Sequence, residues 1–539
     1  MSQALRPSAP ARDLRAEALS GFFFLLIALV WTWPLPRDPF TTTIAMHFDQ
    51  FPAAWLVHAA NSYVPDGVSE WSAFPAGEPT TRLDSFLFAL LAVALHGALP
   101  GLFVTNLFVL FGPPISAWAA ERFAREALGA RFPASLVAGL AFGFSPLALV
   151  GVLEGHVYYL LNPWLPLLAL HAWRTSDGVR GSLTTAALWT LCLLTTAYMG
   201  VNGLVIIGAI FLHRRRIDRV LVVAIAVVGL AYTAIFLAGH GATGRDTGDA
   251  LARLGAASLT TLVAWDAWMD LNRHSLAPAI GLTPLCLALL APMAKSWRGT
   301  AGRTSRMLLA LGLACLILAI GPVLEFGVNR TGGVPTLLYP LLKLGLFDVY
   351  RFPIRFAWVS ALMLGGLGAL VVSEMSRGWQ AAFVTAGMVD ALVLSGDFFR
   401  VHGHPSRTPS AYARLPAGAV LDLYPEVGGA QEDIGFFQQN LSCYYQVSHR
   451  HPIYERCLNT DLTLSPRRKA DALVHDAILS GGDVLAVLHG LGAKSVVAHL
   501  DVYQPFERGE VINRLNASLG GTLSETTDGG EWLMTWGVP

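Results

Sequence analysis

Long apolar stretches fill most of residues 1–397 and alternate with short polar connections. Many of these stretches approach the roughly 20 residues that a membrane-spanning helix needs. We predict spans at 18–36, 102–121, 134–152, 158–173, 182–197, 200–213, 219–238, 276–294, 307–324, 354–375 and 380–396. The pattern therefore predicts a mainly helical, polytopic membrane domain over residues 1–397 with about eleven transmembrane helices.

Two shorter apolar segments lie between the first two spans. Residues 85–99 are apolar over only about fifteen positions, fewer than a span needs. Residues 50–63 would place Phe51, Trp55 and Leu56 toward one face of a helix. We expect both segments to form interfacial or re-entrant helices at the outer leaflet.

The composition changes after residue 397, where apolar runs shorten and glycine-rich turns appear. Residues 419–423 and 495–500 are typical of buried strands, 484–491 of a helix, and 531–536 of a closing strand. Residues 398–539 are therefore expected to form a soluble, extracytoplasmic α/β domain. Such a segment is long enough for one hydrophobic core.

The five cysteines divide between these regions. Cys443 and Cys457 fall in the C-terminal domain, where an oxidising exterior would permit a disulfide between them. Cys192, Cys286 and Cys315 fall in predicted spans, where cysteine commonly serves as a small apolar residue.

Charge placement gives the expected orientation. Lys+Arg and Asp+Glu both number 37, so no broad basic surface indicates a nucleic-acid partner. Basic residues instead gather in the N-terminal leader and in alternate connections, at 122–131, 174–180, 213–216, 295–306 and 377. Because such residues favour the cytoplasmic side, we expect a cytoplasmic N-terminus and a periplasmic C-terminal domain in the inner (plasma) membrane. The first stretch could alternatively be a cleaved signal peptide, but it lacks the usual small-residue cleavage site.

Two acidic motifs fall on the outer side in this topology. Asp49 lies in the short loop Met46-His47-Phe48-Asp49-Gln50 after the first span, and Glu154-Gly155-His156 follows the third. A positioned carboxylate can take a proton from an attacking acceptor. Both motifs also have structural readings: Asp49 could cap the helix that follows it, and Glu154 and His156 could be ordinary polar loop residues.

Three arginines are expected on the same side. Arg351 and Arg355 stand at the start of a late span, and Arg82 lies in the first outer loop. Arginine can meet a phosphate with a bidentate fork, although Arg351 and Arg355 could instead be interfacial anchors that reach lipid headgroups. Within the spans, polar residues such as Asn162 and His171 are expected to join helices.

Several short motifs resemble one known superfamily. They are Ala138-Gly139-Leu140-Ala141-Phe142-Gly143-Phe144-Ser145-Pro146, Trp164-Leu165-Pro166-Leu167 and Tyr350-Arg351-Phe352-Pro353-Ile354-Arg355-Phe356, together with the two acidic motifs. This pattern, over most of residues 15–400, is similar to uncharacterised bacterial members of the GT-C membrane glycosyltransferases. The superfamily includes oligosaccharyltransferase catalytic subunits, protein O-mannosyltransferases and lipid A aminoarabinose transferases.

The resemblance implies a function and roles for the candidate residues. The chain would transfer a hexose or pentose, with inversion, from a polyprenyl-phosphate donor to a lipid, glycan or protein acceptor outside the cytoplasm. Asp49 would be the catalytic carboxylate. The lipid phosphate would be bound by Arg82, His156, Arg351 and Arg355.

The resemblance also implies a divalent metal, Mg or Mn, held by Asp49, Glu154 and His156. The sequence has Glu-x-His where the superfamily usually has Asp-x-Asp, which puts the metal requirement in doubt. His156 could equally donate a hydrogen bond to the lipid phosphate.

Two other classes of membrane protein are alternatives to a glycosyltransferase. A secondary transporter or lipid flippase is also built from many apolar helices, but it usually places charged groups near the bilayer midplane. A non-catalytic assembly factor for envelope polysaccharide would keep the fold without the activity. We find no phosphate-binding glycine loop, Cys-x-x-Cys pair or nucleophile elbow in the sequence.

Overall fold

The computed structural model describes most of the chain, within two compact units. The described residues are 14–43, 50–59, 68–69, 78–79, 85–95, 97–153, 156–174, 178–240, 280–298, 301–320, 323–325, 333–335, 353–393, 404–405, 408–424, 443, 445–446, 451–454, 466–500, 503–526 and 532–539. One unit, here called the helical unit, comprises Met1–Pro36, Leu107–Thr233 and Ala242–His402. The other, the mixed unit, comprises Arg37–Asn106, Ala234–Gly241 and Gly403–Pro539. The predicted division at residue 397 stays a prediction.

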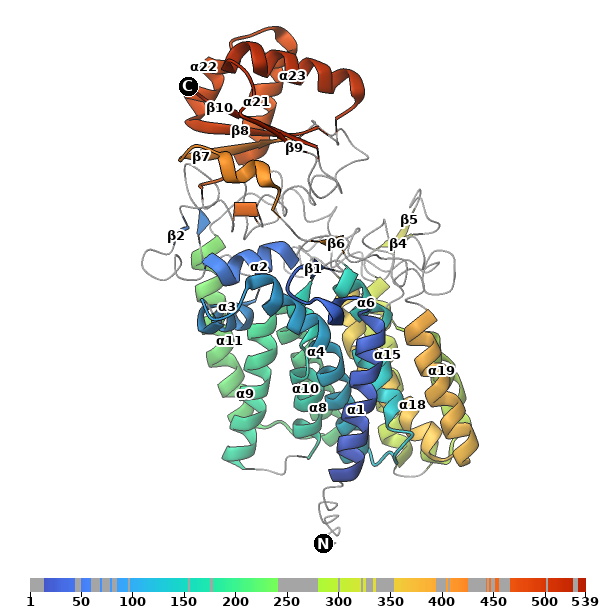
Figure 1. Cartoon of the computed structure of the whole chain (residues 1–539). Helices are drawn as coiled ribbons and strands as arrows, with labels where there is room; N and C mark the ends of the chain where they lie inside the picture. The colour runs from blue at the N-terminus through green and yellow to red at the C-terminus, as the bar shows by residue number, and fades with distance from the viewer. Residues whose placement is uncertain are drawn as a thin grey trace. The chain divides into compact units, whose positions relative to one another are not determined.

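The helical unit is a bundle of long apolar helices (Figure 1). Its described helices are α1 (Leu14–Trp31), α4 (Gly101–Arg122, whose first turns belong to the mixed unit), α5 (Leu136–Gly143), α6 (Pro146–Leu153), α7 (Val157–Leu160), α8 (Trp164–Arg174), α9 (Val179–Thr195), α10 (Ala197–Arg214), α11 (Arg219–His240, whose last turns belong to the mixed unit), α14 (Leu282–Leu290), α15 (Ala301–Ile320), α18 (Ala357–Ser373) and α19 (Arg377–Val393). A π-helical turn, η4 (Phe123–Ala127), extends α4, and a 3₁₀ turn, η8 (Pro353–Phe356), leads into α18.

Helix α18 forms the centre of this bundle, because nearly all of its residues are buried. It packs against α5, α14 and α15. Small residues allow the close approach: a Cβ on Gly365 would lie only 2.8 Å from the Cβ of Ala141 on α5. Such small contact residues are typical of helix packing in membranes.

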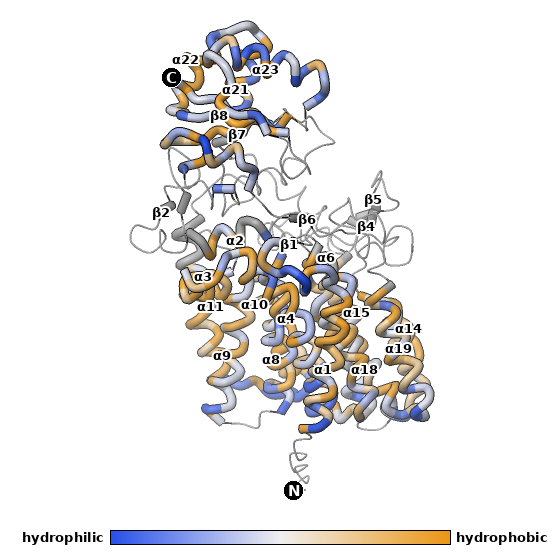
Figure 2. Tube along the Cα trace, viewed as in Figure 1, coloured by the Kyte–Doolittle hydropathy of each residue, from blue (hydrophilic) through white to orange (hydrophobic). Residues whose placement is uncertain are grey.

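Five of the described helices are long and apolar enough to cross a membrane, so the chain is a multi-pass membrane protein. Hydrophobic residues cover most of their length (Figure 2). Each of the predicted spans overlaps a helix, but several of these helices are shorter than a full span. The count of about eleven therefore stays a prediction.

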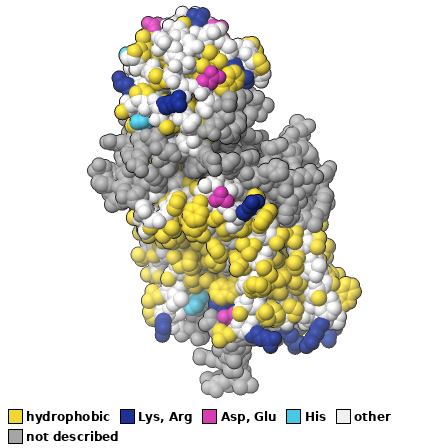
Figure 3. Space-filling model, in the orientation of Figure 1, with side chains coloured by type: hydrophobic (Ala, Val, Ile, Leu, Met, Phe, Trp, Pro, Cys, Tyr) yellow, Lys and Arg dark blue, Asp and Glu magenta, His cyan; other side chains and the backbone are white. Residues whose placement is uncertain are grey.

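Basic residues gather at one end of the helical unit, as the dark-blue side chains at the rim of its apolar surface show (Figure 3). Near the end of α4 the carboxylate of Glu121, 0% exposed, accepts hydrogen bonds from Arg125 Nε at 2.9 Å and Ser135 Oγ at 2.8 Å. Next to it, Glu126 accepts from Arg174 Nη1 at 2.6 Å. The Ser135 hydrogen bond joins α4 to the start of α5, and the Arg174 ion pair joins η4 to α8. Orientation relative to the cytoplasm stays a prediction.

Polar residues inside the bundle join helices, as expected. His171 Nδ1 on α8 lies 3.0 Å from Thr185 Oγ1 on α9. Asn162 donates its backbone N–H to Ser116 Oγ on α4 at 2.9 Å and its side-chain amide to Met199 Sδ on α10 at 3.1 Å. The sequence-based prediction for Asn162 and His171 is therefore confirmed.

The mixed unit holds a four-stranded sheet in the order β7 (Ala419–Leu423), β8 (Ala493–His499), β10 (Leu533–Gly537) and β9 (Ser524–Thr526). Strands β7 and β8 are parallel, and β10 runs antiparallel to both of its neighbours. Helices α21 (Pro466–Ser480), α22 (Val484–Leu491) and α23 (Pro505–Leu519) pack with the sheet around one core. The predicted α/β character of this region is confirmed.

Local sequence explains where these helices begin and end. Asp483 caps α22 by accepting the N–H of Ala486 at 2.9 Å, and Gly492 ends the helix with φ +76°. Only glycine adopts such a positive φ readily. Strand β8 is buried over almost its whole length, as expected of a strand with a parallel neighbour and covered faces.

The first loop also belongs to the mixed unit. It contains the two-residue strand β1 (Thr42–Thr43), helices α2 (Gln50–Ala59) and α3 (Phe86–Leu95), and strands β2 (Val68–Ser69) and β3 (Glu78–Pro79). Both short helices predicted between the first spans are present, and they pack against each other. Their position at a membrane interface stays a prediction.

Candidate functional site

One predicted site residue, Arg355, lies in an aromatic cluster of the helical unit. Its guanidinium carbon lies 4.3 Å from the ring centre of Tyr159 and 4.2 Å from that of Tyr198. The Arg355 side chain also donates a hydrogen bond to the Tyr159 hydroxyl. Contacts at these distances are cation–π interactions, which orient the guanidinium as well as stabilise it.

His156, the second predicted residue in the described part, joins the same cluster. Its ring meets that of Tyr159 edge-on, with the ring centres 5.6 Å apart. The structure thus brings His156 and Arg355 together through Tyr159. The proximity of these two phosphate-binding candidates was not evident from their positions in the sequence.

Elements from distant parts of the chain hold this cluster. Tyr159 lies on the one-turn helix α7, which is tied to α4 because Ser116 Oγ donates to the carbonyl of Leu160 at 2.9 Å. Tyr198 lies in the first turn of α10, which Thr196 caps by accepting the N–H of Met199 at 3.2 Å. The buried amide of Asn202, one turn further on, donates to the backbone carbonyl of Arg355 at 2.9 Å.

The cluster lies at the opposite end of its helices from the basic rim. Helix α10 runs from Tyr198 near its start to Arg214 at its end, and α18 begins just after Arg355 and ends before Arg377. This is the end that the charge pattern assigns to the outer surface.

A second polar cluster lies in the mixed unit, around Gln50 at the start of α2. Gln50 is fully buried. Its Oε1 accepts from Thr43 Oγ1 at 2.6 Å, and its Nε2 donates to Thr105 Oγ1 at 3.1 Å and to Asn106 Oδ1 at 2.5 Å. Asn106 in turn donates to the carbonyls of Pro39 and Thr42, at 2.6 and 2.9 Å. Buried amides of this kind are costly unless paired, so the network fixes these elements together.

This network holds both sides of the segment that contains Asp49. Thr43 ends β1, and Gln50 begins α2. Thr43 is bonded to Gln50, and Gln50 is also bonded to Thr105 and Asn106 of α4. The sequence predicts Gln50 only as the start of a helix, and no local signal indicates its partners on α4.

The other predicted site residues, Asp49, Arg82, Glu154 and Arg351, lie outside the described residues. Among the described residues, no group of three or more His, Cys, Asp or Glu side chains could hold a metal ion. Of the predicted metal ligands only His156 is described, and its ring contacts Tyr159. The roles of all these residues stay predictions.

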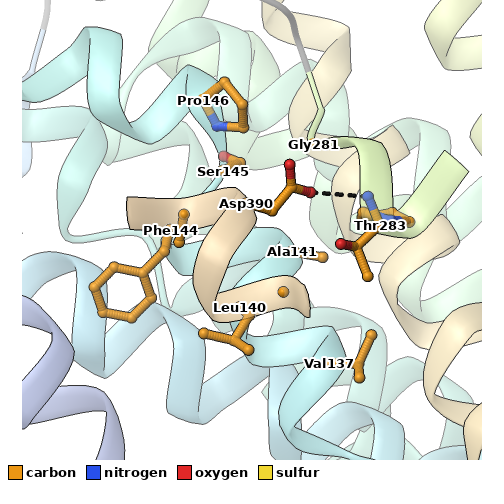
Figure 4. Close-up of a pocket in the computed structure, with 12 residues that line it drawn as sticks. Val137, Leu140, Ala141, Phe144, Ser145, Pro146, Gly281, Thr283 and Asp390 are labelled. Atoms are coloured by element: carbon orange, nitrogen blue, oxygen red, sulfur yellow. Dashed lines mark hydrogen bonds between the residues drawn. The ribbon is translucent and has the colours of Figure 1, made fainter. Parts of the chain in front are cut away.

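A small, mostly apolar pocket lies where α19 meets α14 and the break between α5 and α6 (Figure 4). Asp390 of α19 points toward the start of α14, where its Oδ2 accepts the N–H of Thr283 at 2.8 Å. A Cβ on Gly281 would lie 2.2 Å from that oxygen, so glycine is needed there. Asp390 acts as a cap for α14 supplied by another helix, which a sequence pattern does not reveal.

A bundle of apolar helices with this arrangement and a C-terminal mixed domain has the fold of the GT-C membrane glycosyltransferases. The structure of the arabinofuranosyltransferase AftD from Mycobacteria matches 99% of this chain with a TM-score of 0.57 and 15% identity. The apo oligosaccharyltransferase of Archaeoglobus fulgidus matches 94% with a TM-score of 0.50 and 11% identity. These matches confirm the predicted GT-C resemblance at the level of the fold.

The matched proteins are longer than this chain. The alignment covers 40% of the arabinofuranosyltransferase and 71% of the oligosaccharyltransferase. No model of a known protein family matches the sequence, and no curated protein matches it.

Proposed function

We propose that this chain is a membrane glycosyltransferase that moves a sugar from a polyprenyl-phosphate donor to a lipid, glycan or protein acceptor outside the cytoplasm. The observation that carries the proposal is Arg355 held against Tyr159 and Tyr198, at the non-basic end of a GT-C-like bundle. The inner membrane and a periplasmic mixed domain belong to the same proposal.

Arg355 would bind the phosphate that leaves when the sugar is transferred. Negative charge develops on that phosphate in the transition state, and a preoriented guanidinium stabilises it without reorganising. Contacts with Tyr159 and Tyr198 restrict the side chain before the donor binds. His156, in the same cluster, would donate a further hydrogen bond, and Arg82 and Arg351 are proposed as additional phosphate ligands.

Asp49 would act as the base that takes a proton from the acceptor. The buried bonds of Gln50 and Asn106 support this role, because they fix both sides of the segment that carries Asp49. A catalytic group needs such support, since a displacement of about 1 Å can cost roughly a hundredfold in rate.

A metal held by Asp49, Glu154 and His156 would neutralise phosphate charge, the chemistry that Mg or Mn supplies. The described residues provide one of these ligands, so no step is assigned to a metal. The inverting course, and a hexose or pentose as the sugar, likewise belong to the proposal.

The test is transfer of a radiolabelled sugar from a panel of polyprenyl-phosphate donors to membrane fractions by the full chain in nanodiscs. Wild type is compared with Asp49→Asn. Asparagine caps helices as well as aspartate does but is no base. Loss of transfer in Asp49→Asn therefore indicates that Asp49 is the catalytic base, whereas unchanged transfer indicates that Asp49 only caps a helix.

Asp483→Asn is the matched control, because Asp483 is an exposed N-cap of α22 far from the candidate residues in the chain. Its transfer should equal that of wild type. If wild type transfers no sugar from any donor, the glycosyltransferase proposal is wrong, and a transporter, flippase or assembly factor becomes the better hypothesis.

A further inference from the structure

Two connections within the mixed unit join the first loop to the C-terminal region. Strand β1 pairs antiparallel with β6 (His404–Pro405), which places Thr42 opposite Pro405 and Thr43 opposite His404. Helix α2 is joined to a residue 391 positions later, because Trp55 Nε1 donates to Gln446 Oε1 at 2.7 Å. These connections lie on either side of residues 44–49.

The bond between Trp55 and Gln446 is a buried one. Both side chains are fully buried, and the amide of Gln446 also donates to the carbonyl of His451 at 3.3 Å. An indole N–H that loses its acceptor in such a place keeps its whole desolvation cost. The hydrogen bond between Trp55 and Gln446 therefore favours one position of α2 relative to Gln446.

The residue next to Gln446 is connected to the C-terminal sheet. This residue, Tyr445, packs on Tyr412, with ring centres 5.2 Å apart, and the Tyr412 hydroxyl donates to Asp422 Oδ1 on β7 at 2.5 Å. Cys443, three residues before Gln446, is disulfide-bonded, and Cys457, its predicted partner, lies outside the described residues. These contacts connect the residue next to Gln446 to strand β7.

On its other side, α2 is packed tightly against α4. A Cβ on Gly101, at the start of α4, would lie 2.1 Å from the carbonyl oxygen of Ala54. Trp55 follows that alanine directly, and Gln50 of the same helix is bonded to Asn106. Helix α2 is therefore held by α4 and by Gln446 together.

We infer that residues 403–539 brace the first loop, and that Gln446 is a positioning residue that acts through Trp55 on α2. The C-terminal region then contributes to the reaction through this bond to α2. The structural part of this inference stands on the contacts alone, whereas its catalytic consequence rests on the proposed glycosyl transfer.

The first test is hydrogen exchange of the α2 amides in the full chain in nanodiscs. Trp55→Phe removes the N–H but keeps an aromatic ring, and Gln446→Leu removes the acceptor at similar size. Each is expected to speed exchange in α2 about ten- to a hundredfold, the range that follows from one lost buried hydrogen bond. The double variant should be little worse than either single variant, because both remove the same bond.

Trp536→Phe is the matched control. Trp536 is also fully buried and donates its indole N–H to a side-chain amide, Asn516 Oδ1 at 2.9 Å, but within the C-terminal domain. It should leave α2 exchange unchanged. If α2 exchange does not change in Trp55→Phe and Gln446→Leu, or if Trp536→Phe raises it equally, the brace is ruled out.

The second test uses sugar transfer by the same variants. A positioning role predicts a kcat reduced roughly ten- to a hundredfold with an unchanged KM for the donor, in Trp55→Phe and Gln446→Leu but not in Trp536→Phe. Faster α2 exchange with unaltered kcat would overturn the catalytic part. If wild type transfers no sugar, the proposed function fails, while the exchange result still decides the brace.

Discussion

Gln50 and Asn106, 56 positions apart, are joined by a buried hydrogen bond in which Gln50 Nε2 donates to Asn106 Oδ1 at 2.5 Å. Asn106 uses its own amide to hold the carbonyls of Pro39 and Thr42. The Asn106 side chain of α4 therefore bonds both to the backbone of Pro39 and Thr42 and to the side chain of Gln50 at the start of α2. The described residues on both sides of positions 44–49, Thr43 and Gln50, are thus held together by buried hydrogen bonds.

Asn106→Leu should break the hydrogen bonds of Asn106. The substitution removes acceptor and donor together, so Gln50 loses one of its three partners and two backbone carbonyls lose a donor, at a cost of about 1–3 kcal/mol per buried group left unpaired. We expect a lower midpoint in thermal unfolding and a loss of sugar transfer that exceeds the loss of folded protein. Thermal unfolding and transfer at a temperature where both proteins are folded measure these effects.

Gln380→Leu is the control for Asn106→Leu. Gln380, 8% exposed, donates its amide to one carbonyl, that of Met375, at 3.0 Å in the helical unit. It should lower stability without a selective effect on transfer. Equal transfer per folded molecule in Asn106→Leu and wild type would show that the Asn106 hydrogen bonds have no role in the reaction.

Arg355→Lys should weaken donor binding even though the charge is kept. Lysine lacks the planar fork that binds phosphate with two hydrogen bonds and that stacks on tyrosine rings. We expect the KM for the donor to rise about tenfold or more, consistent with a lost charge-assisted hydrogen bond of about 1.5–3 kcal/mol. Steady-state kinetics over a range of donor concentrations give the value.

Substitutions at Tyr198 separate orientation from charge. Tyr198→Phe keeps the ring face over which Arg355 lies, whereas Tyr198→Leu removes it. The first should leave the donor KM near wild type, and the second should raise it severalfold, since a cation–π contact contributes about 0.5–2 kcal/mol. Arg303→Lys, at the basic end of the bundle, serves as a control. Equal kinetics for Tyr198→Leu and wild type would refute the orienting role.

Local signals explain which parts of the fold were predictable. Strand β7 and helix α22 coincide with the predicted 419–423 and 484–491, because a short apolar run, an N-cap at Asp483 and a glycine at 492 all act within a few residues. Hydropathy likewise indicated the positions of the bundle helices. Short motifs indicated the resemblance to GT-C proteins, and the fold comparison supports that resemblance.

The sites depend on partners far apart in the chain, which explains why they were predictable only in part. Arg355 and Tyr159 are 196 positions apart, and nothing local in either segment specifies the other. Gln50 was missed because an amide at a helix start has no distinctive pattern. Arg355 was predicted as a phosphate ligand from its place at the start of a span, and that role stays a prediction.

Tyr412 should make the mixed unit sensitive to alkaline pH. Burial, and then the negative charge of Asp422, raise the pKa of Tyr412 well above its usual range. Because the unfolded pKa is near 10, the neutral hydroxyl stabilises the fold fully below about pH 10, and this contribution is lost as the pH rises above it. Thermal unfolding of the full chain from about pH 8 to about pH 11 should show stability falling more steeply in wild type than in Tyr412→Phe.

Tyrosinate absorbance provides an independent check on Tyr412. In native protein, Tyr412→Phe should not reduce the alkaline absorbance change, because Tyr412 ionises only when the domain unfolds. If the alkaline absorbance change of native Tyr412→Phe is smaller than that of wild type by one tyrosine, Tyr412 ionises in the folded protein and the prediction is wrong. At neutral pH, Tyr412→Phe should cost about 1–3 kcal/mol, since Asp422 loses a buried donor.

Asp390 distinguishes a transferase from a transporter that moves protons through the bundle. If Asp390 only caps α14, Asp390→Asn should behave almost as wild type, because asparagine keeps an oxygen that can accept the N–H of Thr283. Asp390→Ala should lose about 0.5–2 kcal/mol of stability, and Gly281→Ala should lose stability as well, because its Cβ would clash with the carboxylate. Transfer assays and thermal unfolding on the three variants test this directly. Full loss of function in Asp390→Asn, with the protein still folded, would contradict a capping role and favour a proton-carrying carboxylate.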